Sequence, residues 1–225
     1  MKWDPTWEQI FRSQDWGRYP PEELIRFVAR NYFSAPDRSE IRILELGCGA
    51  GANIWFLARE GFDTYGIDGS QTAIDKAERR LREEGEKARL QIGDVNSILS
   101  FFPPGYFDAV VDVACLQHND LQAVQSILDQ VQVALKPQGR FFSMMVATGS
   151  LGDGLGRELA PGTFIDIEEG PLKDKGLCHF FTLDEVRQLF SFFTELRIEY
   201  GARSLDNRQH EWRLWVIEGA KCAAA

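Results

Sequence analysis

The chain has 225 residues and a net charge of −9, with a pI near 4.9. This length allows one α/β domain with a sizeable core, and an acidic chain without a Lys/Arg-rich run argues against an electrostatic grip on nucleic acid. The four cysteines form no CxxC pair, which disfavours a zinc site and fits a reducing compartment. Without a signal peptide or an 18-residue apolar run, we expect a cytoplasmic protein that does not span a membrane.

Residues 1–33 are rich in aromatic side chains. Asp4-Pro5 predicts the start of a first helix, and residues 22–33 have the pattern of an amphipathic one. The segment either closes over a ligand site as a lid or covers an edge of the sheet, since aromatic residues serve both purposes. In the lid interpretation, Trp16 and Tyr19 contact a substrate.

Residues 41–53 read as a buried parallel strand, a glycine turn and the start of a helix. Alternate glycines suit close approach of a ligand to the backbone, although a glycine-rich turn without a ligand is the plain alternative. The glycine spacing also satisfies the loose dinucleotide fingerprint. Glu45, at the end of the strand, would repel a pyrophosphate and attract an ammonium group. The pattern therefore favours a ligand with an amino-acid end and no phosphate.

The motif Leu44-Glu45-Leu46-Gly47-Cys48-Gly49-Ala50-Gly51 resembles the first motif of class I S-adenosylmethionine-dependent methyltransferases. The resemblance extends over residues 40–145 and implies S-adenosylmethionine as cofactor and S-adenosylhomocysteine as product. It also implies methyl transfer to an O or N atom of a small-molecule acceptor. Glu45 and the loop would hold the methionine end of the cofactor, with these further cofactor-binding residues: Gly47, Cys48, Gly49, Gly51 and Asn53.

The second strand, 64–67, ends at Asp68-Gly69-Ser70, and all three residues are predicted to bind the cofactor. Asp68 lies 21 residues beyond Gly47, the reach at which an acidic side chain meets ribose hydroxyls. Asp68 could instead only cap the next helix, 72–84, but Ser70 is the better cap for it.

The third and fourth strands are expected at 88–92 and 106–113. The resemblance implies that Asp94 accepts from the adenine amino group and that Val95 contacts the ring, although a strand-end aspartate is often just a surface residue. It further implies that Val113 binds the cofactor and that residues 114–118 border the methyl group. A strong helical period follows over 121–135, where Asn119 can cap the start, and the fifth strand covers 139–147.

Two of the three histidines are candidate bases for proton removal from an acceptor. His118 follows the fourth strand at the ligand-binding edge of the sheet, but it could merely bond to backbone. His179 follows a long aperiodic stretch, 148–181, that is typical of a lid or binding loop. Phe164 and Phe180 in this stretch are predicted to contact substrate. His210 lies in a terminal turn and is expected to be solvated.

Thr182 and Glu185 form a capping box for a helix over 185–193, and strands 196–200 and 212–218 complete a hairpin. Strands alternating with helices predict an α/β fold with a mostly parallel sheet and helices on both faces. The resemblance implies the Rossmann-like, seven-stranded form, with an antiparallel strand in the C-terminal hairpin.

We expect a single domain over 1–225, divided into an N-terminal helical lid (1–33), a cofactor-binding core (40–147), a substrate lid (148–181) and a C-terminal helix and hairpin (182–219). No bound metal is expected, and the chain should be a monomer or homodimer without nucleic-acid or membrane partners. Two other functions stay open: a non-catalytic S-adenosylmethionine-binding module and a nicotinamide-dependent oxidoreductase.

Overall fold

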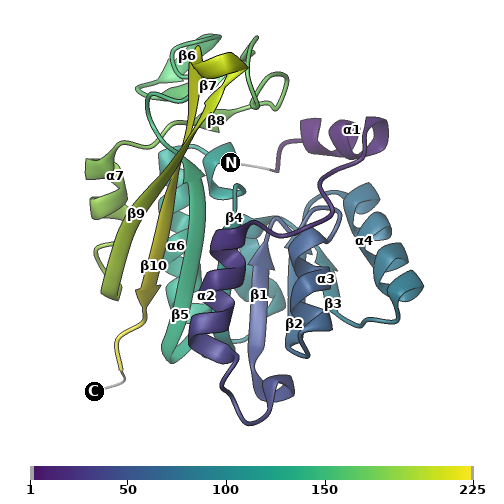
Figure 1. Ribbon diagram of the computed structural model, residues 1–225. Coiled ribbons are helices and arrows are strands. Elements are labelled where there is room, and N and C mark those ends of the chain that lie inside the picture. The colour runs from purple at the N-terminus through teal and green to yellow at the C-terminus, as the bar shows by residue number, and fades with distance from the viewer. Residues whose placement is uncertain (1–2, 224–225) are drawn as a thin grey trace.

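Seven strands form the main sheet of the computed structural model, which describes residues 3–223 (Figure 1). Their order is β3-β2-β1-β4-β5-β10-β9, and β10 runs antiparallel to both of its neighbours. This arrangement confirms the predicted Rossmann-like fold class. The strands are β1 (Arg42–Leu46), β2 (Asp63–Asp68), β3 (Arg89–Ile92), β4 (Phe107–Val113), β5 (Leu135–Val146), β9 (Thr194–Leu205) and β10 (His210–Ala220).

Helices cover both faces of this sheet. Side chains of α2 (Glu22–Tyr32) and α3 (Ala52–Arg59) pack on one face, with α4 (Gln71–Glu84) beside α3. The other face carries α6 (Leu121–Ala134) and α7 (Leu183–Leu189), next to the short α5 (Ile98–Phe101). Since β1 and β4 contribute side chains to both clusters, their nearly continuous apolar sequence is explained by burial on two sides.

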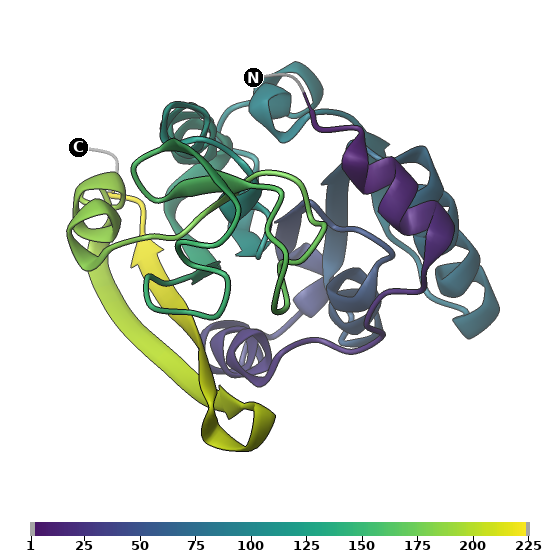
Figure 2. The same cartoon turned by 90° about the horizontal axis from the view of Figure 1, so that it is seen from above.

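The first helix, α1 (Thr6–Ser13), lies apart from these two layers. It crosses above the carboxyl ends of β1 and β2 and packs beside α4 (Figures 1 and 2). Ile10 and Phe11 are its buried residues, and Asp4 accepts a hydrogen bond from the Thr6 N–H at its start. Helix α1 therefore covers the ligand-binding edge of the sheet rather than one of its side edges.

The stretch 148–181 is not the aperiodic connection that the sequence predicts. It contains a second, three-stranded antiparallel sheet of β6 (Arg157–Ala160), β7 (Thr163–Ile165) and β8 (Cys178–His179). These strands have two to four residues each, too few for an alternating pattern to show in the sequence. The small sheet sits over the carboxyl ends of β4 and β5 (Figure 1).

For α4, α6 and α7, the sequence predicts two of three N-cap residues correctly. Ser70 caps α4 by accepting from the Ala73 N–H, and the predicted capping box at Thr182 is present. The cap of α6 is Asp120 and not Asn119, whose amide instead donates to the Cys115 carbonyl. Asp120 directly precedes the helix, so its carboxylate reaches the N–H groups of the first turn.

The largest differences between the predicted and observed element boundaries lie in the second half of the chain. Helix α7 ends at Leu189, before the predicted end at 193. Strand β5 starts at Leu135, immediately after α6. The hairpin strands β9 and β10 are longer than predicted, and their tip extends beyond the sheet toward the small second sheet (Figure 1).

Candidate functional site

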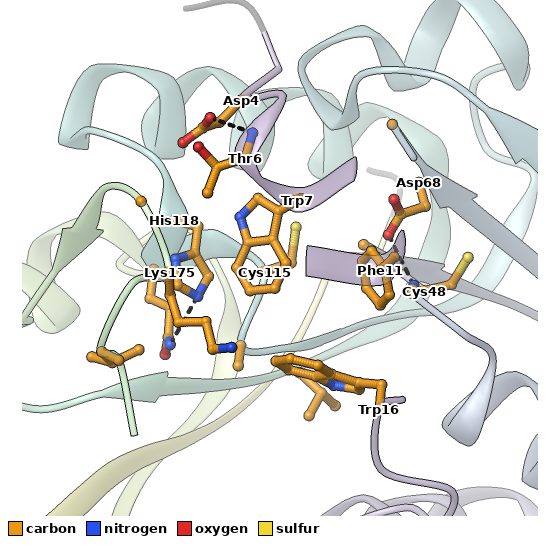
Figure 3. A pocket seen from close by; sticks show the side chains of 18 of the residues that line it. Asp4, Thr6, Trp7, Phe11, Trp16, Cys48, Asp68, Cys115, His118 and Lys175 are labelled. Atoms are coloured by element: carbon orange, nitrogen blue, oxygen red, sulfur yellow. Dashed lines mark hydrogen bonds between the residues drawn. The ribbon is translucent and has the colours of Figure 1, made fainter. Parts of the chain in front are cut away.

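A cavity of about 940 Å³ opens at the carboxyl ends of β1, β2 and β4, where ligands bind in open α/β sheets (Figure 3). Loops after these strands form its floor. Helix α1, the segment 165–177 and the β9–β10 hairpin supply the rest of the wall. The two predicted lid segments thus both contribute side chains to the same cavity as the glycine loop.

The three glycines of the loop after β1 have different functions. All have positive φ, at +61° for Gly47, +51° for Gly49 and +80° for Gly51. A Cβ on Gly47 would overlap Cys115, and one on Gly51 would lie 2.8 Å from the Ala77 Cβ, so these two glycines permit packing. Gly49 lines the cavity, whereas Gly51 does not. Gly47 lines it as well, and ligand approach to the loop at Gly47 and Gly49 stays a prediction.

Glu45 lines this cavity and keeps one carboxylate oxygen without a hydrogen-bond partner among the described residues. The side chain is 2% exposed, and its Oε1 accepts a hydrogen bond of 2.6 Å from the Asn53 amide. Its Oε2 is buried without a hydrogen-bond partner among residues 3–223. Burial raises the pKa of Glu45 well above its ordinary value, and the nearby carboxylates of Asp68 and Asp112 add to the shift. A buried acceptor oxygen of this kind calls for a donor from outside the chain.

Asp68 joins two of the loops that form the cavity floor. One carboxylate oxygen accepts from the Gly49 N–H at 2.9 Å, and the other accepts from the Ser70 N–H at 2.8 Å. Burial raises the pKa of Asp68, which these backbone hydrogen bonds oppose. Asp68 is therefore more than the free acceptor that the sequence predicts, because it also fixes the glycine loop. A carboxylate has further lone pairs, so both oxygens can still accept from a ligand.

Helix α1 is anchored across the cavity rim by hydrogen bonds. The Glu8 carboxylate accepts from the hydroxyls of Ser70 and Thr72, each at 2.6 Å, and these bonds lower the pKa of Glu8 to about 2. The Trp3 N–H donates to Asp94, and the Trp3 indole lies on Gly69, where a Cβ would overlap it. Neither Glu8 nor Trp3 stood out in the sequence, because partners more than 60 positions away leave no local pattern.

His118 lies inside the cavity as a neutral imidazole. Its Nδ1–H donates to the Leu177 carbonyl at 2.9 Å, and the Trp7 ring centroid lies 4.6 Å from its own (Figure 3). The Gln117 Oε1 accepts from the Val146 N–H, so its amide nitrogen is the atom that faces His118 Nε2 at 3.3 Å. Burial lowers the pKa of His118 to about 4. The side chain is thus a hydrogen-bond acceptor at Nε2 near neutral pH.

Replacing His118 with glutamine is expected to reduce the loss of stability on acidification. With the pKa of His118 near 4 in the folded chain and about 6.5 when unfolded, the unfolded chain binds more protons between these values. The stability contribution is present above about pH 6.5 and is lost as pH falls toward 4. Between pH 7 and 5, wild type should lose about 1–2 kcal/mol more than His118→Gln in urea unfolding. His210→Gln, at a position outside the cavity, is the control. If His118→Gln loses as much stability between pH 7 and 5 as wild type does, the prediction is wrong.

The structure brings only some of the predicted substrate residues to the cavity. Trp16 and Tyr19 line it, as does Val113. Phe164 and Phe180 instead pack in an apolar cluster under the small sheet. His179 is fully buried, with its Nδ1 2.7 Å from the Thr163 hydroxyl, and does not line the cavity.

The predicted cofactor residues are distributed in a similar way. Among them, only Gly51 and Ser70 do not line the cavity. The ones that do are Glu45, Gly47, Cys48, Gly49, Asn53, Asp68, Gly69, Asp94, Val95 and Val113.

Several residues that line the cavity are not predicted from the sequence. The main ones are Trp7, Lys175, Arg203 and Trp212. Over residues 3–223, no cluster of three or more His, Cys, Asp or Glu side chains is arranged to hold a metal ion. In the same part of the chain, no helix has the length and apolar character needed to cross a membrane.

Comparisons with known proteins agree with this geometry. Residues 43–139 match a family model described as a methyltransferase domain. A ubiquinone biosynthesis O-methyltransferase of Xylella fastidiosa is 33% identical over 136 residues, 59% of this chain and 54% of that protein. Norajmaline N-methyltransferase of Rauvolfia serpentina is 27% identical over 100 residues, 43% of this chain and 33% of that protein. The chain spans about half the length of the curated relatives it matches first.

Solved structures extend the likeness to most of the chain. A SAM-dependent methyltransferase from Methanosarcina mazei superposes with a TM-score of 0.66 at 24% identity, covering 82% of this chain and 94% of that one. This likeness concerns the fold. The family-model match covers residues 43–139, which is most of the segment 40–147. Residues 43–139 are therefore similar to a methyltransferase domain, and the chain shares its fold with a SAM-dependent methyltransferase.

Proposed function

We propose that this protein transfers a methyl group from S-adenosylmethionine to an O or N atom of a small-molecule acceptor. The observation that carries the proposal is the unpartnered, buried Oε2 of Glu45 at the cavity wall. An α-ammonium group supplies the donor that this oxygen needs, and its positive charge suits a carboxylate. The pyrophosphate of a dinucleotide would instead meet like charges at Glu45, Asp68 and Asp94.

The proposed cofactor contacts follow the cavity floor. Glu45 and the loop at Gly47 and Gly49 would hold the methionine end, and Asp68 would accept from the ribose hydroxyls. Asp94 would accept from the adenine amino group. Since the Trp3 N–H and indole occupy Asp94 and Gly69 in this structure, Trp3 would have to shift for adenine to reach them.

When bound, the cofactor supplies an electrophilic methyl group on a sulfonium. The chain's contribution is then alignment, because an in-line displacement depends on the placement of the reacting atoms. His118 would orient the acceptor through Nε2, in place of the Gln117 amide that lies 3.3 Å from this atom. With a pKa of about 4, His118 is too weak a base to take up an acceptor's proton fully at neutral pH, so the hypothesis favours hydrogen bonding over proton abstraction.

We place the acceptor beneath the two lid segments, 1–33 and 148–181. Trp16 and Tyr19 from the first segment support this placement, and so do Leu172 and Leu177 from the second, because all four line the cavity. His179, Phe164 and Phe180 are not part of the acceptor site proposed here. Glu8 holds α1 over the cavity, so we expect entry of ligands to require a shift of this segment, beginning at Trp3.

Calorimetry separates this function from the oxidoreductase alternative. S-adenosylhomocysteine is expected to bind, whereas NAD is expected not to bind, because Glu45 suits an ammonium and opposes a phosphate. Binding of NAD with no response to S-adenosylhomocysteine would reverse the proposal. Turnover of S-adenosylmethionine in the presence of a panel of phenols, amines and carboxylic acids then tests catalysis. Cofactor binding without any turnover across the panel would favour the non-catalytic binding module.

A further inference from the structure

Positive charge in the cavity is confined to the wall opposite the strand ends. The floor carries the carboxylates of Glu45, Asp68 and Asp94, whereas Lys175 and Arg203 line the roof. Lys175 belongs to the segment between β7 and β8, and its Nζ lies 5.0 Å from the Trp16 ring centroid (Figure 3). The ammonium group thus faces the interior, between His118 and Trp16. In a chain with a net charge of −9, this grouping of cations is unexpected.

Neither Lys175 nor Arg203 forms an ion pair with another described residue. Within residues 3–223, no carboxylate lies within the ion-pair limit of 4.0 Å from Lys175 or Arg203. Two further carboxylates, Asp4 and Asp166, also line the cavity, and Asp174 is the neighbour of Lys175 in the chain. Asp4 accepts from the Thr6 N–H at 2.9 Å, and Asp166 lies 3.6 Å from Arg157. A charge left unpaired in a cavity is satisfied best by a ligand of opposite charge.

Trp16, the ring beside the Lys175 ammonium, belongs to a group of aromatic side chains that line the cavity. Trp7 and Trp16 meet edge to face with centroids 5.7 Å apart, and Phe11 lies 5.8 Å from Trp16. Trp212 is the cross-strand partner of Arg203 in the β9–β10 hairpin and also lines the cavity. Flat apolar walls of this kind suit a ring, because large aromatic surfaces bury most area when a planar group lies against them.

We propose that the methyl acceptor is a ring-bearing, apolar anion whose charged group binds the Lys175 ammonium, with Arg203 reinforcing the attraction at the cavity mouth. This inference rests on the proposed function and names the substrate class of that site. Burial lowers the pKa of Lys175, and the charge of Asp174 opposes this shift. The lowered pKa agrees with an ammonium group that has lost part of its hydration. His118 is neutral, so it does not compete with Lys175 for the anion.

Three probes with one ring system and different charges test the proposal: 2-naphthoate, 2-naphthamide and 2-naphthylmethylammonium. Each is titrated by calorimetry into the full chain saturated with S-adenosylhomocysteine. We expect the anion to bind about tenfold or more tightly than the amide, and the cation to bind weakest. Lys175→Met keeps an apolar stem of similar length and should reduce the preference for anion over amide to about threefold or less.

Lys173→Met is the matched control, because Lys173 is exposed on the same segment and does not line the cavity. It should keep the wild-type preference. Equal binding of the three probes, a preference for the cation, an unchanged preference in Lys175→Met, or binding of none of them would each overturn the proposal. Failure of the proposed function looks different, because S-adenosylhomocysteine itself would then not bind before any probe is added.

Discussion

Glu45→Gln is expected to weaken the binding of S-adenosylhomocysteine by about 100-fold, which corresponds to close to 3 kcal/mol. Glu45 lines the cavity and its Oε2 has no partner among the described residues, and glutamine replaces this charged acceptor with a neutral amide. The substitution conserves size and can keep the contact with Asn53. The affinity is measured by calorimetry at pH 7.5.

The pH dependence of binding gives a second measure of the same residue. Because burial raises the pKa of Glu45, the empty protein holds a proton there at pH values where an exposed carboxylate is ionised. A cofactor ammonium favours the carboxylate, so binding should release a proton and strengthen as pH rises through this raised pKa. Calorimetry in buffers of different ionisation enthalpy measures the released proton. The Gln variant should show neither the proton release nor this part of the pH dependence.

The stability of the Glu45→Gln variant separates binding from folding. A carboxyl whose folded pKa is raised binds more protons folded than unfolded, so its stability contribution is present at low pH and is lost as pH rises through the raised pKa. The neutral Gln variant should therefore be no less stable than wild type at pH 7.5. Glu83→Gln, on the exposed face of α4, is the control. Unchanged affinity in Glu45→Gln would remove Glu45 from the cofactor site.

The cofactor-binding core could be predicted from sequence because its signals are local. Glu45 stands at the end of an apolar strand, the glycines follow at once, and Ser70 precedes a helix that it caps. Each of these features depends on neighbours a few positions away. The family resemblance then supplied the number of strands and the antiparallel strand of the hairpin, which periodicity alone does not give.

The roof of the cavity could not be predicted in the same way. The anchor of Glu8 on Ser70, and the approach of Lys175 to Trp16, join segments that are distant in sequence. Phe164 and His179 were predicted to face a substrate because their segment looked like an open loop. The short strands β7 and β8 instead turn Phe164 into an apolar cluster and His179 toward Thr163. Strand pairing over so few residues decided which side chains face the cavity.

Gly49→Val is expected to abolish detectable binding of S-adenosylhomocysteine, a loss of more than about 100-fold. A Cβ at this position would project toward α1 and lie 3.1 Å from Cζ of Phe11. The branched side chain would crowd Phe11 and fill the space between the loop and α1, where the proposed cofactor site lies. It would also disturb the Gly49 N–H that donates to Asp68, so two of the proposed cofactor contacts would be lost together.

Backbone strain is the effect that has to be separated from this loss of binding. Gly49 has a φ of +51°, and a β-branched residue in that region costs about 1–3 kcal/mol wherever it occurs. Gly105 offers a matched control, because its φ is +64° and a Cβ there would meet nothing within 4 Å. Gly105→Val should lose similar stability in thermal unfolding and keep its affinity for S-adenosylhomocysteine.

The gentler change Gly49→Ala places a single methyl group in the same position. It should bind S-adenosylhomocysteine more weakly than wild type and more tightly than Gly49→Val, because the loss follows the volume added over the loop. If Gly49→Val instead binds as tightly as Gly105→Val, the loop backbone does not approach the cofactor. If Gly49→Val unfolds while Gly105→Val stays folded, Gly49 serves the packing of α1, through Phe11, rather than the ligand.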